Sequence, residues 1–157
     1  MQVAPENSKV RFEISNFRVN TVEGTFSGMK GTVNFPDNRP EMGEIAVCLE
    51  AASINTDNET RDRHLRGEDY FYTEKYPEIC FRSSEILKSE LGYVARGTLS
   101  MRGVEKRVEI PFSYSGNILR ASFTVNRKDY NIGQGTGSFT MGEEVELSIY
   151  CQLQTAP

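Results

Sequence analysis

Residues 45–81, IAVCLEAASINTDNETRDRHLRGEDYFYTEKYPEICF, decide the fold of this chain. Apolar and polar or small residues alternate from Ile45 to Leu49 and again from Ile79 to Phe81. Alternation with a period of two is typical of a half-buried β-strand. Between the two strands the alternation stops, over a polar and aromatic insert of about residues 56–76. The insert contains His64, the only histidine of the chain, and is therefore the first place to look for chemistry.

The insert predicts a short helix over about residues 57–66. Thr56 and Glu59, three residues apart, fit a capping box, in which each side chain accepts a hydrogen bond from an N–H group of the first turn. Gly67 suits the left-handed conformation that ends many helices. Because Leu65 is the only apolar residue of this helix, the helix cannot bury a face by itself. We expect a lid, held in place by the aromatic residues that follow it.

Outside the insert the sequence alternates between strands and turns. Strands are expected over 10–14, 21–35, from 45, 78–89, 93–101, 104–112, 117–126 and 144–153, with tight turns at Arg102-Gly103 and Ser115-Gly116. Strands in unbroken order with one apolar face favour an antiparallel sheet. We therefore predict an all-β fold, an antiparallel β-barrel of about eight strands with a short helical insert, in a single domain over residues 1–157.

The second of these strands contains a change of parity. Val22 and Phe26 lie on even positions, whereas Met29, Val33 and Phe35 lie on odd ones. A regular strand cannot turn both sets to one side unless a residue is inserted. We therefore predict a bulge at Gly28, which would bend the strand as a closing barrel requires.

The apolar residues that share the inward parity are the predicted lining of the barrel lumen. They are Phe12, Val47, Phe81, Tyr93, Ala95, Leu99, Ile110, Phe112, Ala121, Phe123, Leu147 and Ile149. Alternation by itself does not distinguish a solid core from a ligand cavity. The small inward residues Ala95, Gly97 and Ala121 favour a cavity, because they leave room on one side of the barrel.

Composition excludes several classes of protein. A net charge of −4 and a pI of about 5.2 argue against nucleic-acid binding, which needs many phosphates to be neutralised. No apolar run approaches the roughly 20 residues of a transmembrane helix. Cys48, Cys80 and Cys151 lie far apart without a C-x-x-C pair, so we expect neither a zinc cluster nor a disulfide framework, but small residues within strands.

Residues 1–10 contain no apolar segment of a signal peptide. A chain from which a leader was trimmed would be periplasmic, and a leaderless chain would be cytoplasmic. Unpaired cysteines favour the cytoplasm slightly.

The insert does not define a catalytic or metal site from its residues. His64 has no accompanying nucleophile motif from which a triad could be assembled, and His64 with Asp62 or Asp69 supplies too few ligands for structural zinc. We predict no catalytic residue, no metal and no cofactor. The arginines of the helix suit an anionic head group, although their spacing alone favours a solvated face with internal ion pairs.

Several motifs together resemble the YceI-like family. They are AASINTDNETRDRHLR, DYF and YPEICFRS in the central stretch, VEGTF at residues 22–26, Gly103-Val104, Arg127 with Asp129-Tyr130, and EVEL at residues 144–147. The resemblance covers nearly the whole chain. It implies a lipocalin-like barrel that binds a long isoprenoid or other amphiphilic lipid, with carriage, storage or stress protection as its use. The family contains exported and cytoplasmic members.

The resemblance also implies where a ligand would bind. The tail would occupy the lumen, and Arg61, Asp62, His64 and Arg66 are the candidates for contact with its head group. The expected partner is thus a small lipid, and a homodimer is left open. Two other functions remain: an enzyme that modifies a lipid or quinone with His64, and a protein-interaction module whose barrel is solid.

Overall fold

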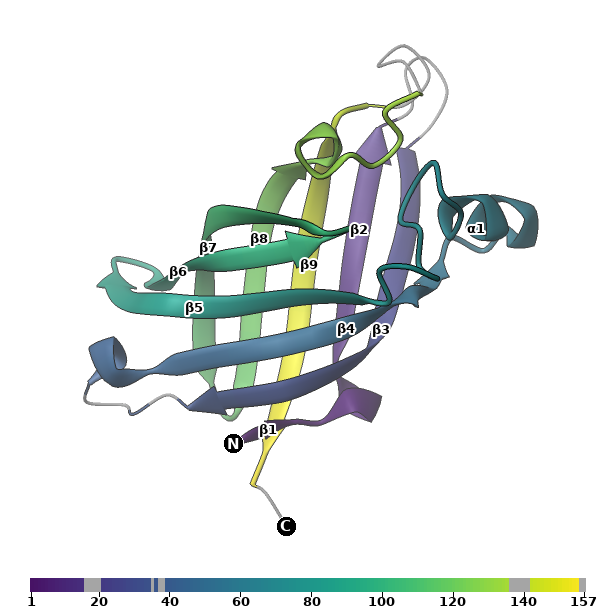
Figure 1. Cartoon of the computed structure of the whole chain (residues 1–157). Helices are drawn as coiled ribbons and strands as arrows, with labels where there is room; N and C mark the ends of the chain where they lie inside the picture. Colours follow the sequence, from purple (N-terminus) through teal and green to yellow (C-terminus); the bar gives the residue numbers. More distant parts are fainter. Residues whose placement is uncertain (16–20, 35, 37–38, 136–141, 156–157) are drawn as a thin grey trace.

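The chain forms one closed β-barrel with a short helix at one end (Figure 1). This computed structural model describes residues 1–15, 21–34, 36, 39–135 and 142–155. Its strands are β1 (Gln2–Val3), β2 (Lys9–Ser15), β3 (Thr21–Asn34), β4 (Glu44–Asn55), β5 (Glu78–Ser89), β6 (Gly92–Met101), β7 (Val104–Ser115), β8 (Ile118–Asn126) and β9 (Glu144–Gln154). The helix α1 spans Glu59–Leu65, and three 3-10 turns are η1 (Pro5–Asn7), η2 (Pro40–Met42) and η3 (Arg127–Tyr130).

All strand pairs are antiparallel. The order around the barrel is β3-β2-β9-β8-β7-β6-β5-β4, and the pairing of β4 with β3 closes it. The short strand β1 pairs with both β3 and β9. It therefore lies between these two strands, as β2 does further along the barrel. Eight long strands therefore form the wall, as predicted. No helix among the described residues is long and apolar enough to cross a membrane.

Strand β3 contains the predicted bulge. Its pairing with β4 shifts register twice between Thr25 and Lys30, and Gly28 has a φ of 71°, which a residue without Cβ adopts at little cost. Phe26, Met29 and Val33 are all buried as a result. The bulge thus turns apolar residues of both parities into one interior, which confirms the prediction for these residues; Phe35 lies outside the described residues.

The hairpin turns agree with the prediction in one case and differ by one residue in another. Arg102 and Gly103 both have positive φ, as a two-residue type I′ turn requires. In the next hairpin the positive φ values belong to Gly116 and Asn117, so the predicted Ser115-Gly116 turn is wrong by one position. Asparagine tolerates positive φ better than most residues, so this pair suits a type I′ turn.

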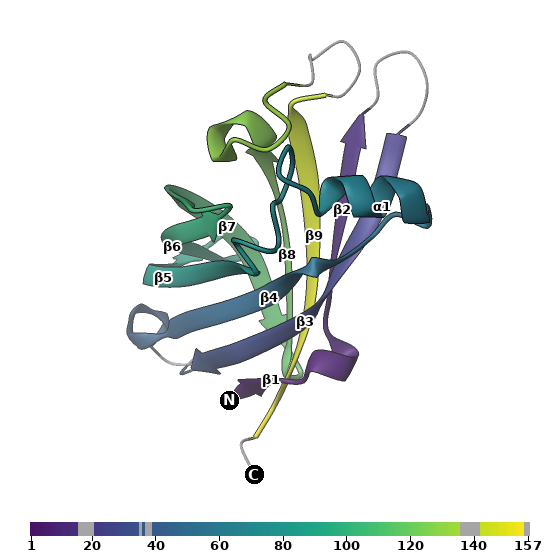
Figure 2. The ribbon, with the colours of Figure 1, turned by 45° about the vertical axis from the view of Figure 1, so that its right-hand side comes forward.

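The insert lies at the end of the barrel opposite β1 and the last residues of β9 (Figures 1 and 2). Two hydrogen bonds to backbone carbonyls of the insert hold it there. The Arg102 guanidinium donates to the carbonyl of Glu68, and the Gly133 N–H donates to the carbonyl of Asp69 at 2.8 Å. The insert therefore covers this end as a lid, which we define as residues 56–76.

The helix of the lid begins later than predicted. Its N-cap is Asn58, whose side chain accepts from the Arg61 N–H at 3.0 Å, so the predicted Thr56–Glu59 capping box is wrong. Gly67 is also not in the left-handed conformation. Thr56 has a different role: its N–H donates to the Asp62 carboxylate at 2.9 Å, and its hydroxyl donates to the same oxygen. Both residues are buried, so this pair ties α1 to the end of β4.

Replacement of Thr56 by alanine is expected to loosen the lid. The change removes the hydroxyl that donates to the Asp62 carboxylate and accepts from the Arg61 Nε at 2.8 Å. A hydrogen bond to a charged group contributes about 1.5–3 kcal/mol, so the free energy of unfolding should fall by about that amount. Hydrogen exchange should accelerate in residues 59–65 while β7–β9 stay protected. Thr56→Ser is the matched control, and equal protection loss in both variants would contradict this role.

The cysteine prediction is wrong for two of the three residues. Cys48 of β4 and Cys80 of β5 form a disulfide. They are 32 residues apart in sequence, on either side of the insert, but β4 and β5 pair so that the two residues lie directly opposite, with a Cα–Cα distance of 4.1 Å. The argument for the cytoplasm from unpaired cysteines therefore loses its basis.

Candidate ligand-binding site

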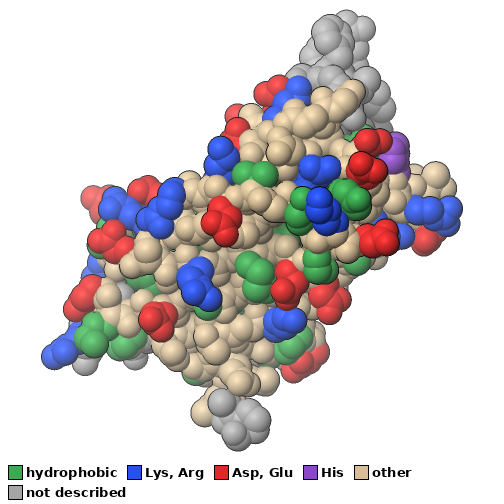
Figure 3. All heavy atoms as spheres, viewed as in Figure 1, with side chains coloured by type: hydrophobic (Ala, Val, Ile, Leu, Met, Phe, Trp, Pro, Cys, Tyr) green, Lys and Arg blue, Asp and Glu red, His purple; other side chains and the backbone are tan. Residues whose placement is uncertain are grey.

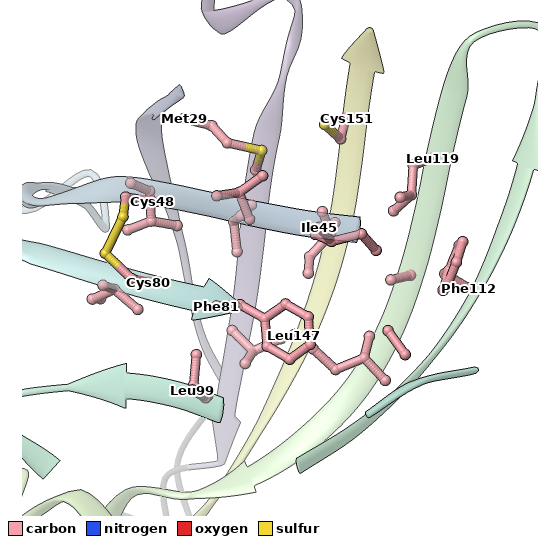
Figure 4. Close-up of a pocket in the computed structure, with 18 of the residues that line it drawn as sticks. Met29, Ile45, Cys48, Cys80, Phe81, Leu99, Phe112, Leu119, Leu147 and Cys151 are labelled. Atoms are coloured by element: carbon pink, nitrogen blue, oxygen red, sulfur yellow. A yellow bond between two sulfur atoms is a disulfide. The ribbon is translucent and has the colours of Figure 1, made fainter. Parts of the chain in front are cut away.

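The barrel encloses an apolar cavity, which we call cavity 1, with a volume of about 120 Å³. Every wall strand contributes to it, and side chains from opposite walls point toward one another (Figure 4). Its lining contains no charged residue: Val10, Phe26, Met29, Val33, Ile45, Val47, Cys48, Leu49, Ile79, Cys80, Phe81, Ala95, Leu99, Met101, Ile110, Phe112, Leu119, Ala121, Phe123, Leu147, Ile149 and Cys151.

The barrel interior is not a solid core. Leu147 and Ile149 of β9 and Phe123 of β8 face inward but are only partly buried. A water needs roughly 10–15 Å³ of such volume, so cavity 1 has room for several. An alternation pattern could not show this, because it specifies the face of a residue and not how closely the opposite wall approaches.

A second cavity, cavity 2, lies under the lid and has a volume of about 170 Å³. It shares Phe26, Met101 and Leu147 with cavity 1, so these three residues stand between the two. The remaining lining is mostly apolar but includes polar groups of the lid and of η3: Phe12, Ile14, Val22, Ile54, Arg61, His64, Leu65, Tyr70, Phe71, Val125, Arg127, Ile132 and Val145. The lumen is therefore apolar at one end and carries cationic groups at the other.

Most of the predicted lumen residues border these cavities. Cavity 1 takes Val47, Phe81, Ala95, Leu99, Ile110, Phe112, Ala121, Phe123, Leu147 and Ile149, and cavity 2 takes Phe12. Tyr93 lies apart from both: it stacks on Phe112 at 5.4 Å and borders a shallow outer depression. Gly97 does not provide room either, because a Cβ there would lie 2.2 Å from the Arg82 carbonyl oxygen.

The four head-group candidates separate into two pairs. Arg61 and His64 border cavity 2, whereas Asp62 and Arg66 do not. Asp62 is buried and accepts from Thr56, and a guanidinium nitrogen of Arg66 lies 3.9 Å from a Glu59 carboxylate oxygen. Spacing on a short helix could not decide this, because neighbouring residues point to different sides of it.

Arg61 is held in place by Thr56, the residue that follows β4. Its Nε donates to the Thr56 hydroxyl and its Nη2 to the Thr56 carbonyl, both at 2.8 Å. His64 is exposed and packs edge-on against the Tyr70 ring, with centroids 5.1 Å apart. The lid thus presents a fixed guanidinium and an accessible imidazole at the mouth of cavity 2.

Sequence analysis missed Arg127 as a cavity residue. It is only 2% exposed, and its guanidinium donates to the carbonyls of Gly142, Ile132 and Gly133 at 2.7–2.9 Å. Burial lowers the pKa of this guanidinium, while Tyr70 and Glu143 oppose the shift. The one available signal was its place in the YceI-like motif, next to Tyr130.

Three potential metal ligands meet on the outside of the wall. A sulfur of Cys48, a sulfur of Cys80 and a carboxylate oxygen of Glu78 all lie within 4.8 Å of one another. Both sulfurs are in the disulfide, and Glu78 pairs with the Lys30 ammonium at 3.2 Å. No thiolate is available there while the disulfide is closed.

The third cysteine is expected to be inert in the folded protein. Cys151 is free and buried, and burial raises the pKa of its thiol to about 11. At pH 8 the thiolate that reacts with iodoacetamide or Ellman's reagent is therefore scarce. Ellman titration should find no thiol in the native protein, one after unfolding, and three after unfolding with a reductant. A thiol that reacts quickly under native conditions would contradict the buried position.

A small antiparallel barrel, an apolar lumen and a polar lid define the class of this protein, and comparison with known proteins agrees. Residues 1–153 match the YceI-like domain. The UPF0312 protein plu2095 of Photorhabdus laumondii is 30% identical over 159 residues, covering 95% of this chain and 83% of the relative. A UPF0312 protein of Yersinia pestis is 29% identical, covering 92% and 80%. The chain belongs to the YceI-like family.

Solved structures show the same fold. BcnA of Burkholderia cenocepacia superposes with a TM-score of 0.89 at 22% identity, covering 97% of this chain and 99% of the other. The YceI protein of Campylobacter jejuni gives 0.78 at 23% identity, covering 92% and 91%. A polyisoprenoid binding domain from Saccharophagus degradans gives 0.71 at 14% identity, covering 96% and 95%.

Proposed function

We propose that the protein binds a long amphiphilic lipid of the isoprenoid type in the barrel lumen and carries or stores it unchanged. The observation that carries this proposal is the polarity of the lumen: cavity 1 has a wholly apolar lining, and cavity 2 has cationic groups under the lid. An apolar tail in cavity 1 gains about 25 cal/mol for each Å² removed from water. The head group would then lie near Arg61 and His64.

The family supports this proposal in a general way. The Saccharophagus domain is described as polyisoprenoid binding, and the present chain has its fold. The Cys48–Cys80 disulfide favours an oxidising compartment such as the periplasm as the place of action, because disulfides persist there.

The enzyme alternative needs a second polar group beside His64. Among the described residues that border cavity 2, the titratable ones are Arg61, His64, Tyr70 and Arg127, and none is a carboxylate. General base catalysis requires an acceptor within hydrogen-bond reach of the reacting proton. The described lining thus supplies no carboxylate to orient or activate the imidazole, so a binding role fits better.

Mass spectrometry of lipids extracted from the protein purified from its native host, without added lipid, tests the proposal. The expected result is one or a few isoprenoid chains in stoichiometric amount, of the same mass as those in the host membrane. A protein that carries no lipid and binds none on addition would overturn it. Altered lipid masses that disappear in His64→Ala would favour the enzyme.

A further inference from the structure

The Cys48–Cys80 disulfide lies on the outer side of the barrel wall. Cys48 and Cys80 border cavity 1, as do their neighbours Val47, Leu49, Ile79 and Phe81. The side chains of Glu78 and Arg82, which share the face of Cys80 on β5, are exposed, so by alternation along the strand the sulfurs lie toward the outer side of the wall. The exposed side chain of Glu78, on the same face of β5, has a carboxylate oxygen within 4.8 Å of both sulfurs. Both cysteines are only partly buried, so a small thiol in solution can reach them.

The disulfide also lies where the lid joins the barrel. The pairing of β4 with β5 runs from Ala46 opposite Arg82 to Glu50 opposite Glu78. One further hydrogen bond joins the Ala51 N–H to the Pro77 carbonyl at 2.9 Å. Beyond it the lid begins at once on the β5 side, whereas β4 continues to Asn55, paired with β3, before the lid starts. The disulfide therefore closes a loop that contains the whole lid.

The backbone pairing at this junction is short. The pairing of β6 with β7 continues from Tyr93–Phe112 to Met101–Val104, whereas that of β4 with β5 ends soon after the cysteines. Segments with few protecting interactions open locally at low cost. A covalent bond across this short pairing restricts how far the two ends of the lid can separate.

We propose that Cys48 and Cys80 form a thiol–disulfide exchange site for small dithiol reductants, and that its redox state controls the opening of the lid over cavity 2. A thiolate of the reductant attacks one sulfur and forms a mixed disulfide, while the other cysteine leaves as a thiolate and takes up a proton. The second thiol of the reductant then attacks the mixed disulfide and releases the first cysteine. In total two electrons and two protons reach the protein, and the reductant becomes a disulfide.

Two opposite charges lie beside the disulfide. Lys30 lies opposite Cys48 in the pairing of β3 with β4, on the same outer face, and its ammonium lies 3.2 Å from the Glu78 carboxylate. The Glu78 carboxylate disfavours a departing thiolate, and the Lys30 ammonium reduces this effect by pairing with the carboxylate. The third cysteine takes no part, because Cys151 is buried on the inner face of β9.

The first test measures reduction and lid opening without any ligand. Dithiothreitol in native buffer should reduce Cys48–Cys80 completely, as shown by alkylation and mass spectrometry. Hydrogen exchange in residues 56–76 should then accelerate by about tenfold or more, as expected for easier local opening, while β7–β9 keep their protection. Diamide, a thiol oxidant, should restore the slow exchange. Cys151→Ser should keep the full redox response.

Two results would overturn the proposal: a disulfide that is reduced only after denaturant is added, or a lid whose exchange rate is the same in both redox states. Cys48→Ser/Cys80→Ser should reproduce the reduced state. If that variant does not fold, Cys48→Val/Cys80→Val takes its place, because valine suits a β-strand. Reversible reduction of the parent protein tests the proposal without any variant.

The effect on lipid exchange rests on the proposed function and is measured separately. The release of parinaric acid, a fluorescent polyene, should be faster from the reduced protein by about the same factor as lid opening. A protein that never binds this probe would count against the proposed function and leave the redox and hydrogen-exchange results intact. If the lid opened on reduction but the probe were released no faster, the redox state of the disulfide would not control access to cavity 2.

Discussion

Replacement of Ala121 by phenylalanine is expected to lower the affinity for an apolar ligand by about tenfold or more, with little change in stability. Ala121 of β8 borders cavity 1 and is 8% exposed. The new ring would occupy space that a tail otherwise fills, and each CH₂ of the tail kept from burial loses about 0.8 kcal/mol. A titration with parinaric acid measures the affinity, and a thermal melt measures the stability.

Thr124→Phe is the control for this variant. Thr124 lies on the same strand with the opposite parity and is exposed, so the same ring added there leaves the lumen unchanged. In a solid core, a phenylalanine at position 121 would overpack the interior and cost about 1–3 kcal/mol. Strong destabilisation of Ala121→Phe, together with a parent protein that binds no ligand, would refute the carrier.

Replacement of Arg127 by methionine is expected to destabilise the protein by about 3–5 kcal/mol, because it removes the donor of several buried hydrogen bonds that contribute about 1.5–3 kcal/mol each. The guanidinium satisfies the carbonyls of Gly142, Ile132 and Gly133, and methionine keeps the apolar volume but donates nothing. For a chain of this length the melting temperature should fall by roughly 6–20 °C. Hydrogen exchange should accelerate first in residues 127–135 and in the part of the lid bonded to Gly133.

Lys128→Met gives the comparison at the adjacent residue. The Lys128 ammonium lies 3.5 Å from a Glu143 carboxylate oxygen, and both side chains are partly exposed. Such pairs contribute about 0–1 kcal/mol, so this variant should melt close to the parent. If both methionine variants melted alike, the buried hydrogen bonds of Arg127 would not hold this end of the barrel.

The sequence predicted the strands well where the alternation was uninterrupted. The bounds of β5 agree with the prediction, because alternating residues run without a break between the insert and the next hairpin. The bulge at Gly28 was also predictable, since a change of parity leaves few other solutions. The mixture of acidic and basic side chains on the face in Figure 3 agrees with the low net charge.

Local patterns misled where a tertiary contact competed with them. Thr56 and Glu59 have the spacing of a capping box, but the Thr56 hydroxyl donates to Asp62 and the helix begins at Asn58. Both residues suit an N-cap, so only the fold of the lid against β4 selects between them. The spacing of the helix arginines likewise could not show that Arg61 borders cavity 2 and Arg66 does not.

The sequence by itself determined the all-β class, the strand positions, the inward face of each strand and the place of the insert, because each depends on periodicity within a short stretch. Only the tertiary structure decided that the barrel is hollow, that Cys48 meets Cys80, and that Arg127 is buried under the lid. These three facts depend on the register between strands and on the distance between opposite walls. Both are set by closure of all eight strands together, which no single stretch of sequence contains.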